Sequence, residues 1–347
     1  MKLKFEEEAI DLGKNNLDLF KSLSGKTIFI TGATGLIGSQ LINVLTVLNK
    51  NFELNMKIVA FVRSIEKAHK KFNDIVDQIE IFPGDIKTRI DYPSRIDYII
   101  HGASVTASRD FVETPIDTIL TAIDGTKSIL NLAIEKQVSG FVYLSSLEIY
   151  GNLNKVEINE SDYGTIDPLN VRSSYSESKR MVETLCISYA HQYGVPVKIA
   201  RLTQTFGPGV EYTDSRVFAQ LARSVIEKKD IILHTTGETM RSYCYTLDAV
   251  SAIVHILLRG AIGEAYNVAN EETFISIRDM AELACTLEKE KSIKVIIDMQ
   301  DTSSFGYNPT IKINLKTNKL KSLGWLPTTD LKGMFNTLIE SMLENKV

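Results

Sequence analysis

The chain has few cysteines and no long apolar run, and both shortages narrow its class. Its three cysteines, Cys186, Cys244 and Cys285, are scattered over 347 residues, which predicts neither a disulfide framework nor a zinc site. No segment approaches the roughly 18 consecutive apolar residues of a membrane helix. Acidic residues also stand where a signal peptide needs its apolar centre. We therefore expect a cytoplasmic protein with no bound metal and no membrane partner.

A strong net charge is missing as well. The chain carries 39 basic and 43 acidic residues, for a formal charge of −4 at pH 7. This balance argues against a nucleic-acid-binding face. The apolar fraction of 44% and the charged fraction of 24% are typical of a soluble globular protein. The length predicts one large domain, or a large domain with a smaller lobe.

A glycine-rich turn is the strongest feature that is present. It runs from Thr31 to Gly38, between a β-branched segment at 26–30 that predicts a strand and an apolar segment at 41–48 that predicts a helix. Small residues let backbone N–H groups approach a pyrophosphate, and the helix N-terminus adds partial positive charge. The turn therefore predicts a dinucleotide site; the alternative is an ordinary glycine-rich loop. The expected contacts are Gly32, Thr34, Gly35, Leu36, Ile37 and Gly38.

Strands and helices alternate along the following residues. Further strands are predicted at 57–62, 78–82, 96–100 and 141–144, and helices at 116–136 and 173–189. This alternation predicts an α/β fold with a Rossmann-type doubly wound parallel sheet and a smaller mixed α/β lobe. The pattern of residues 1–24 predicts an amphipathic extension. Its candidate packing residues are Phe5, Ile10, Leu17, Leu19 and Phe20.

The end of the second predicted strand lacks an expected acid. In NAD sites an acidic residue about 20 positions after the glycines binds the ribose, whereas an Arg there accommodates the 2′-phosphate of NADP. This chain has Val62-Arg63-Ser64 at that point. Arg63 is therefore either a cofactor-binding residue that accompanies a 2′-phosphate or a solvated strand-end residue, and the spacing leaves both interpretations open.

The candidate catalytic residues follow the fifth predicted strand. Ser146 stands at its carboxyl end, the edge where open α/β sheets bind ligands. Tyr175 and Lys179 are four residues apart and so share one helix face. A nearby ammonium, together with a positively charged oxidised nicotinamide, favours the phenolate of a tyrosine, whose pKa is ordinarily near 10. Tyr175 would then accept a hydroxyl proton while a hydride leaves the same carbon, and Ser146 would hydrogen-bond that oxygen. The alternative is a surface Tyr–Lys pair.

The glycine turn, Ser146 and the Tyr175–Lys179 pair together resemble the extended short-chain dehydrogenase/reductases of the nucleotide-sugar epimerase/dehydratase family, from about Lys26 to the C-terminus. The resemblance implies bound NAD, with NADP as the alternative, a nucleotide-sugar substrate, and a homodimer formed through helices 116–136 and 173–193. It also implies a dinucleotide-binding domain over 25–206, to which parts of 242–270 return, and a mainly substrate-binding lobe over 207–347. The implied adenine and loop contacts are Asp85, Ile86 and Ala103, with His101 in a structural role.

The resemblance extends to three candidate substrate-binding residues. Gln204 stands where the family has an asparagine that usually meets the sugar nucleotide. Arg216 and Arg241 match arginines that hold the nucleotide diphosphate, a task that suits a bidentate guanidinium. For either arginine taken alone, the alternative is a surface ion pair.

The reaction depends on the turn after Ser146. Several motif details resemble UDP-glucuronate decarboxylases. One of them, Glu148, is the fourth candidate catalytic residue that the resemblance implies, and 4,6-dehydratases carry a glutamate at this position too. Leu147 departs from both, because a leucine cannot transfer a proton, whereas a 4-epimerase needs only Ser146, Tyr175 and Lys179. We expect transient oxidation at C4 followed by decarboxylation, dehydration or epimerisation. A net NADPH-dependent carbonyl reductase is the second hypothesis, and a non-catalytic cofactor-binding protein the third.

Overall fold

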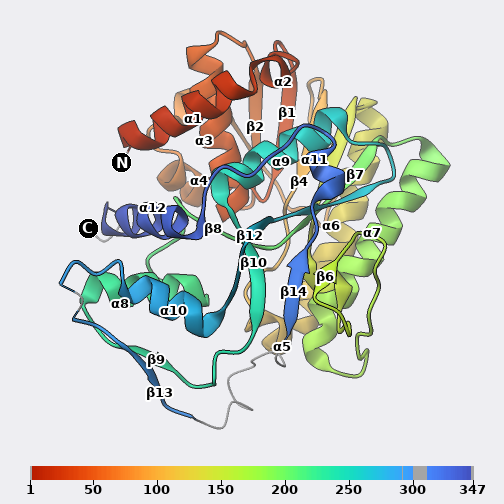
Figure 1. Ribbon diagram of the computed structural model, residues 1–347. Coiled ribbons are helices and arrows are strands. Elements are labelled where there is room, and N and C mark those ends of the chain that lie inside the picture. Colours follow the sequence, from red (N-terminus) through yellow and green to blue (C-terminus); the bar gives the residue numbers. More distant parts are fainter. Residues whose placement is uncertain (1, 291, 300–310, 345–347) are drawn as a thin grey trace.

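A seven-stranded parallel sheet forms the centre of the computed structural model, which describes residues 2–290, 292–299 and 311–344 (Figure 1). The strand order is β11-β7-β5-β4-β1-β2-β3. The strands are β1 (Thr27–Thr31), β2 (Lys57–Val62), β3 (Glu80–Pro83), β4 (Tyr98–His101), β5 (Gly140–Ser146), β7 (Val197–Leu202) and β11 (Ala265–Val268). The order reverses between β1 and β4, so a crevice opens beyond their carboxyl ends. The predicted Rossmann-type parallel sheet is confirmed.

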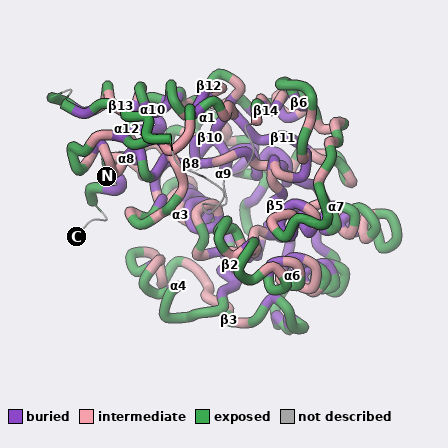
Figure 2. Tube along the Cα trace, turned by 90° about the horizontal axis from the view of Figure 1, so that it is seen from below, coloured by how far each residue is buried: buried purple, intermediate pink, exposed green. Residues whose placement is uncertain are grey.

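Helices cover both faces of this sheet (Figure 1). α3 (Leu36–Asn51) and α9 (Thr246–Arg259) pack together on one face, and α6 (Pro115–Lys136) and α7 (Ser174–Tyr193) pack together on the other. Neighbouring residues of β1 accordingly enter different cores. Ile28 and Ile30 join the α3/α9 core, whereas Phe29 joins the core beneath α6. The resulting buried layer follows the strands through the molecule (Figure 2).

Two predicted strands begin two residues later in the structure, and the limits of β2 are as predicted, while the other predicted strand limits differ by one or two residues. Residues 76–78 form a 3₁₀ turn, so β3 begins at Glu80 rather than at residue 78. β4 begins at Tyr98 rather than at residue 96. Next to it, the Asp97 carboxylate accepts a hydrogen bond from the backbone N–H of Thr27 at 2.9 Å, and the Asp97 backbone N–H donates to the Thr27 carbonyl at 3.0 Å. α4 (Ile65–Lys71) follows β2 directly.

The remaining strands build a second, smaller layer. A five-stranded sheet contains β6 (Glu157–Ile158), β8 (Gln204–Phe206), β10 (Met240–Tyr245), β12 (Asn270–Ser276) and β14 (Lys312–Leu315), and a two-stranded sheet pairs β9 (Ile231–Leu233) with β13 (Val295–Ile297). The helices here are α8 (Val217–Glu227), α10 (Ile277–Cys285) and α12 (Leu331–Glu344), whereas α11 (Asn318–Lys321) packs on β11 and α9 of the large sheet. α9 and β11 join the large sheet, so the chain passes between the layers more than once. The predicted domain limits stay a prediction.

The N-terminal extension folds into α1 (Lys2–Asn15) and α2 (Leu17–Lys21), which lie over α3 and α9 (Figure 1). Leu19 and Phe20 are fully buried, while Ile10 and Leu17 are half-buried. A Cβ at Gly13 would lie 2.4 Å from a Leu48 side-chain atom, so α1 packs very closely on α3. None of the described helices is both long and apolar enough to span a bilayer.

Candidate active site

A cavity of about 700 Å³ lies beyond the carboxyl ends of the parallel strands. Its lining combines the glycine turn, the end of β5, the first turns of α7 and part of the smaller sheet. Every candidate site residue named from the sequence lines it: Gly32, Thr34, Gly35, Leu36, Ile37, Gly38, Arg63, Asp85, Ile86, Ala103, Ser146, Glu148, Tyr175, Lys179, Gln204, Arg216 and Arg241. The structure therefore gathers these residues in one place; their roles remain predictions.

The glycine turn needs its glycines for close packing. Gly32 has φ +67°, and a Cβ there would lie 2.6 Å from the Gly102 backbone. A Cβ at Gly38 would lie 2.3 Å from the Gly32 carbonyl oxygen. α3 starts directly after Gly35, which has no side chain to cap the first-turn N–H groups. The uncapped helix N-terminus facing the cavity fits a bound pyrophosphate.

His101 acts as a structural link, as the sequence suggested. Its two ring nitrogens lie 2.7 Å from the Thr31 hydroxyl and 2.9 Å from the Thr126 hydroxyl. Burial, aided by the charge of Lys179, lowers its pKa to about 3, so the ring is neutral. The Thr31 hydroxyl also accepts a hydrogen bond from the backbone N–H of Ala103, at 3.2 Å. This network fixes the loop beneath the cavity.

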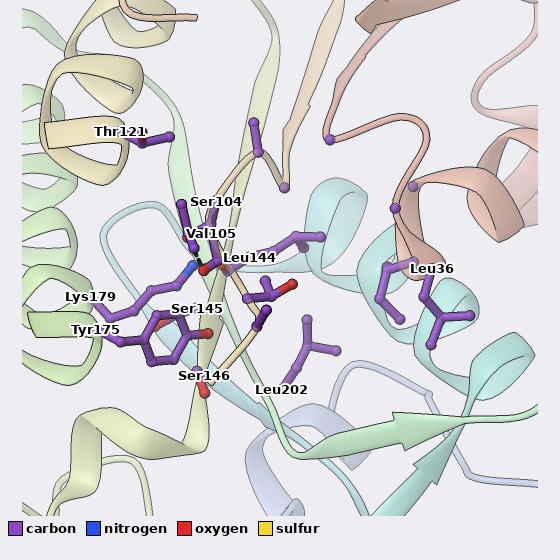
Figure 3. A pocket seen from close by; sticks show the side chains of 18 of the residues that line it. Leu36, Ser104, Val105, Thr121, Leu144, Ser145, Ser146, Tyr175, Lys179 and Leu202 are labelled. Atoms are coloured by element: carbon purple, nitrogen blue, oxygen red, sulfur yellow. Dashed lines mark hydrogen bonds between the residues drawn. The ribbon is translucent and has the colours of Figure 1, made fainter. Parts of the chain in front are cut away.

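Tyr175 and Lys179 project from α7 toward the end of β5, with Leu36 of the glycine turn on the other side of the cavity (Figure 3). The Lys179 ammonium donates a hydrogen bond to the Leu144 carbonyl at 2.8 Å. Ser146 ends β5 and caps the next turn, because its hydroxyl accepts a hydrogen bond from the Glu148 N–H at 3.2 Å. Ser146, Tyr175 and Lys179, three of the four candidate catalytic residues, thus converge on one wall of the cavity.

Burial dominates the electrostatics of the pair. It raises the pKa of Tyr175, with Glu148 adding to the rise and the hydrogen bond to Ser146 and the charge of Arg172 opposing it. Burial also lowers the pKa of Lys179 to about 8, against the opposing charge of Glu183. In the protein without its dinucleotide, burial therefore outweighs the groups that oppose the rise in the Tyr175 pKa, and the expectation that Lys179 and an oxidised nicotinamide together favour the phenolate stays a prediction.

Glu148 is held by residues that the sequence analysis did not single out. The Arg172 guanidinium donates to both carboxylate oxygens, at 2.9 and 3.0 Å, and the Ser176 hydroxyl donates at 3.0 Å. Arg172 also lies 4.8 Å above the Phe111 ring, which stacks on Tyr175 with centroids 4.3 Å apart. A cation just before a helix N-terminus is electrostatically disfavoured, and this anomaly was the available signal for Arg172. No comparable signal marks Phe111.

Leu147 is an apolar packing residue. It is buried in a cluster that also contains Ile149, Ile158 and Leu315. The leucine therefore joins the turn after β5 to the smaller sheet, which accounts physically for an apolar residue beside Glu148.

A second buried network supports the same turn from behind. Glu183 accepts hydrogen bonds from the Ser145 hydroxyl and from the Arg201 guanidinium, the latter in a bidentate arrangement. Arg201 also donates to the Tyr150 hydroxyl at 3.0 Å. These contacts tie β5, α7 and β7 together next to Ser146.

The candidate substrate residues differ in how they are engaged. The side-chain Oε1 of Gln204 and the Nε of Arg241 are buried and have no hydrogen-bond partner among the described residues. Gln204 and Arg241 come from the paired strands β8 and β10. Arg216, in contrast, is already paired with Asp214, and the pKa of that carboxyl is lowered by its hydrogen bonds to Arg216 against the cost of burial. Gln204 and Arg241 both line the cavity, although these two atoms are themselves enclosed by the protein.

The sheet order and the uncapped glycine turn define a Rossmann-type nucleotide-cofactor protein. The chain belongs to the NAD dependent epimerase/dehydratase family, whose model matches residues 28–269. It is therefore an enzyme of that family.

Curated relatives and solved structures agree with this placement. UDP-glucuronic acid decarboxylase 6 of Arabidopsis thaliana is 29% identical over 310 residues, covering 89% of this chain and 86% of the relative. An epimerase of Methanothermobacter thermautotrophicus has a similar structure, with a TM-score of 0.80, 21% identity and 95% of each chain covered. UDP-glucuronic acid 4-epimerase of Bacillus cereus, solved in complex with NAD, gives a TM-score of 0.72 at 21% identity, covering 92% of this chain and 97% of that one.

Proposed function

We propose that this enzyme oxidises a nucleotide sugar transiently at C4, using a bound nicotinamide dinucleotide, NAD or NADP. One observation carries the proposal: a single cavity is lined by the uncapped glycine turn, the Ser146–Tyr175–Lys179 set, and the polar side chains of Gln204 and Arg241. The glycine turn suits a dinucleotide, and the Ser146–Tyr175–Lys179 set suits a hydroxyl that is being oxidised. The side chains of Gln204 and Arg241 suit a polar, anionic substrate. The likeness to a decarboxylase of UDP-glucuronic acid supports the same substrate class.

Each catalytic side chain has a role that fits its position. Tyr175 accepts the proton of the substrate hydroxyl, and Ser146 donates a hydrogen bond to the oxygen that becomes a ketone. Lys179 supplies a positive charge one helical turn away. A bound dinucleotide would supply the site that takes up and returns the hydride, and its oxidised ring would add a positive charge that opposes the burial penalty on the Tyr175 phenolate.

The fate of the 4-keto sugar depends on Glu148. Both of its carboxylate oxygens are engaged by Arg172 and Ser176, and Leu147 cannot move a proton. This arrangement supports epimerisation, which needs only the other three residues. Likeness to the Arabidopsis decarboxylase supports loss of carbon dioxide instead. We propose decarboxylation, dehydration and epimerisation as the three outcomes that an experiment must separate.

We propose that the protein works as a homodimer through α6 and α7. The two helices pack side by side and carry exposed apolar side chains, among them Leu120 on α6 and Met181 on α7. Burying them against a second copy would remove apolar surface from water.

The reaction is tested by supplying UDP-, dTDP-, CDP- and GDP-sugars with NAD⁺ or NADPH. Product mass and nicotinamide absorbance are followed together. Loss of carbon dioxide, loss of water and unchanged mass identify the three outcomes, each without net cofactor consumption. Stoichiometric oxidation of NADPH would instead identify the second candidate, a carbonyl reductase, which Arg63 supports. No change with any sugar would overturn both.

The role of Tyr175 is tested by Tyr175→Phe. We expect turnover to fall by at least about a thousandfold, in the range of a lost acid–base group, while dinucleotide binding is retained. Tyr193→Phe, at an exposed position of the same helix, is the matched control and should leave turnover unchanged. Substantial activity in Tyr175→Phe would remove Tyr175 from the mechanism.

A further inference from the structure

One end of the cavity, beside the last residues of β2, carries an excess of positive charge. Arg63, Lys67 and Lys87 line it together, and Asp85 is the acidic residue that shares this end. The Asp85 carboxylate accepts a hydrogen bond from the N–H of Lys87 at 2.9 Å, so part of its accepting capacity is used by its own turn.

Backbone contacts place the two cations that follow β2. The N–H of Gly84 donates to the Val62 carbonyl at 2.9 Å, so pairing with β3 continues to the end of β2 and the chain leaves the sheet at Arg63. Ser64 then caps α4, because its hydroxyl accepts a hydrogen bond from the Lys67 N–H at 3.1 Å. Lys67 is thereby held in the first turn, close to the point where Arg63 leaves the sheet.

Both cations are available to a ligand. Lys71, one turn further along α4, is paired with Glu211. Across the described part of the chain, neither Arg63 nor Lys67 has an ion-pair partner. Both side chains are exposed where they line the cavity. An acid able to accept hydrogen bonds from two ribose hydroxyls is missing from this strand end, where Phe61 and Val62 are followed by Arg63.

We propose that Arg63 and Lys67 form a subsite for the 2′-phosphate of a dinucleotide, so that this chain selects NADP over NAD. The inference rests on the proposed function, because it concerns the adenosine end of the same dinucleotide. A guanidinium offers two parallel donors to a phosphate, and the ammonium of Lys67 adds a second charge. A 2′-hydroxyl offers neither group a comparable partner.

The test is calorimetric titration of the wild-type protein with NADP⁺ and NAD⁺, repeated with the fragments adenosine 2′,5′-bisphosphate and 5′-AMP. We expect the 2′-phosphorylated member of each pair to bind at least about tenfold more tightly, as one charge-assisted hydrogen bond implies. This preference should shrink as salt is added.

Variants assign the preference to the two cations. Arg63→Ala should lower NADP⁺ affinity at least about tenfold and leave NAD⁺ affinity unchanged, and Lys67→Ala should do the same to a smaller degree. Lys70→Ala removes an exposed lysine of α4 that does not line the cavity, and it should change neither affinity. If Arg63→Ala does not fold, Lys67→Ala and the wild-type fragment pair still decide the question.

Two results would overturn the subsite. One is NAD⁺ binding as tightly as NADP⁺, and the other is an equal loss of both affinities in Arg63→Ala. With sugar turnover intact, either result would leave the proposed function standing. Absence of binding by both dinucleotides would instead overturn the proposed function itself.

Discussion

Replacing Lys179 with methionine should stabilise the folded protein while abolishing turnover. The Lys179 side chain is 3% exposed, and burial lowers its pKa from 10.5 to about 8. This difference in pKa corresponds to a destabilisation of the folded state by about 3 kcal/mol at neutral pH, where the buried Lys179 ammonium is charged. Methionine has a similar length and no charge, so we expect a gain of about 1–3 kcal/mol in the free energy of unfolding at pH 7.

The stability advantage of Lys179→Met should depend on pH, because the Lys179 pKa differs between the folded and unfolded states. Between about pH 8 and 10.5 the unfolded chain keeps the Lys179 proton while the folded chain has lost it, so the wild-type protein gains stability as pH rises through that window. Below about pH 8 both states are protonated and the penalty is fully present. The advantage of Lys179→Met should therefore be largest at pH 7 and vanish near pH 10.5.

Urea unfolding of the cofactor-free proteins at several pH values measures this advantage. Lys50→Met, at an exposed position of α3, is the matched control and should show a small difference with little pH dependence. The reasoning fails if Lys179→Met is less stable than wild type at pH 7, or if its advantage is the same at pH 7 and pH 10. The first result would mean that the contacts of the ammonium outweigh its desolvation.

Three further outcomes are expected. Gly38→Ala should lower the free energy of unfolding, measured with urea, by about 1–3 kcal/mol, because the new Cβ would meet the rigid Gly32 carbonyl. It should also weaken dinucleotide binding in a titration. Unchanged values would contradict the close packing. Arg172→Ala should lower kcat roughly 10–100-fold and leave dinucleotide affinity unchanged, since Glu148 loses its bidentate partner. Arg172→Lys should restore little of the lost kcat. Full activity of Arg172→Ala would exclude a positioning role. Met181→Glu should convert a dimer to a monomer in light scattering, and a dimer that persists would place the interface elsewhere.

The sequence predicted the parallel sheet because its strands carry strong local signals. β1 is five residues long and wholly buried, so an unbroken β-branched and aromatic run marks it clearly. The start of β4 was harder to predict, since the Thr27 N–H is bound by the carboxylate of Asp97, 70 residues away, rather than by a strand carbonyl. Local sequence patterns show periodicity and contain no information about contacts between residues so far apart in the sequence.

The candidate site also combines features that the local sequence predicts with contacts between distant residues that it does not predict. Spacing alone places Tyr175 and Lys179 on one helix face, and the glycine turn marks the opposite wall. The Arg172–Glu148 pair joins residues 24 positions apart, and the Phe111–Tyr175 stack brings a separate short helix, α5 (Asp110–Glu113), onto the catalytic tyrosine. The burial that raises the pKa of Tyr175 is likewise a property of the assembled core.

The close docking of α1 and α2 has a practical consequence for where the chain can be cut. The family match begins at residue 28, which invites trimming of everything before β1. Such a cut would strip Leu19, Phe20 and Leu23 from the core and uncover apolar surface on α3 and α9. It would also remove Glu8, which accepts a hydrogen bond from the Tyr245 hydroxyl at 2.6 Å. A shortened chain would therefore be prone to aggregation, and a useful boundary lies before α1.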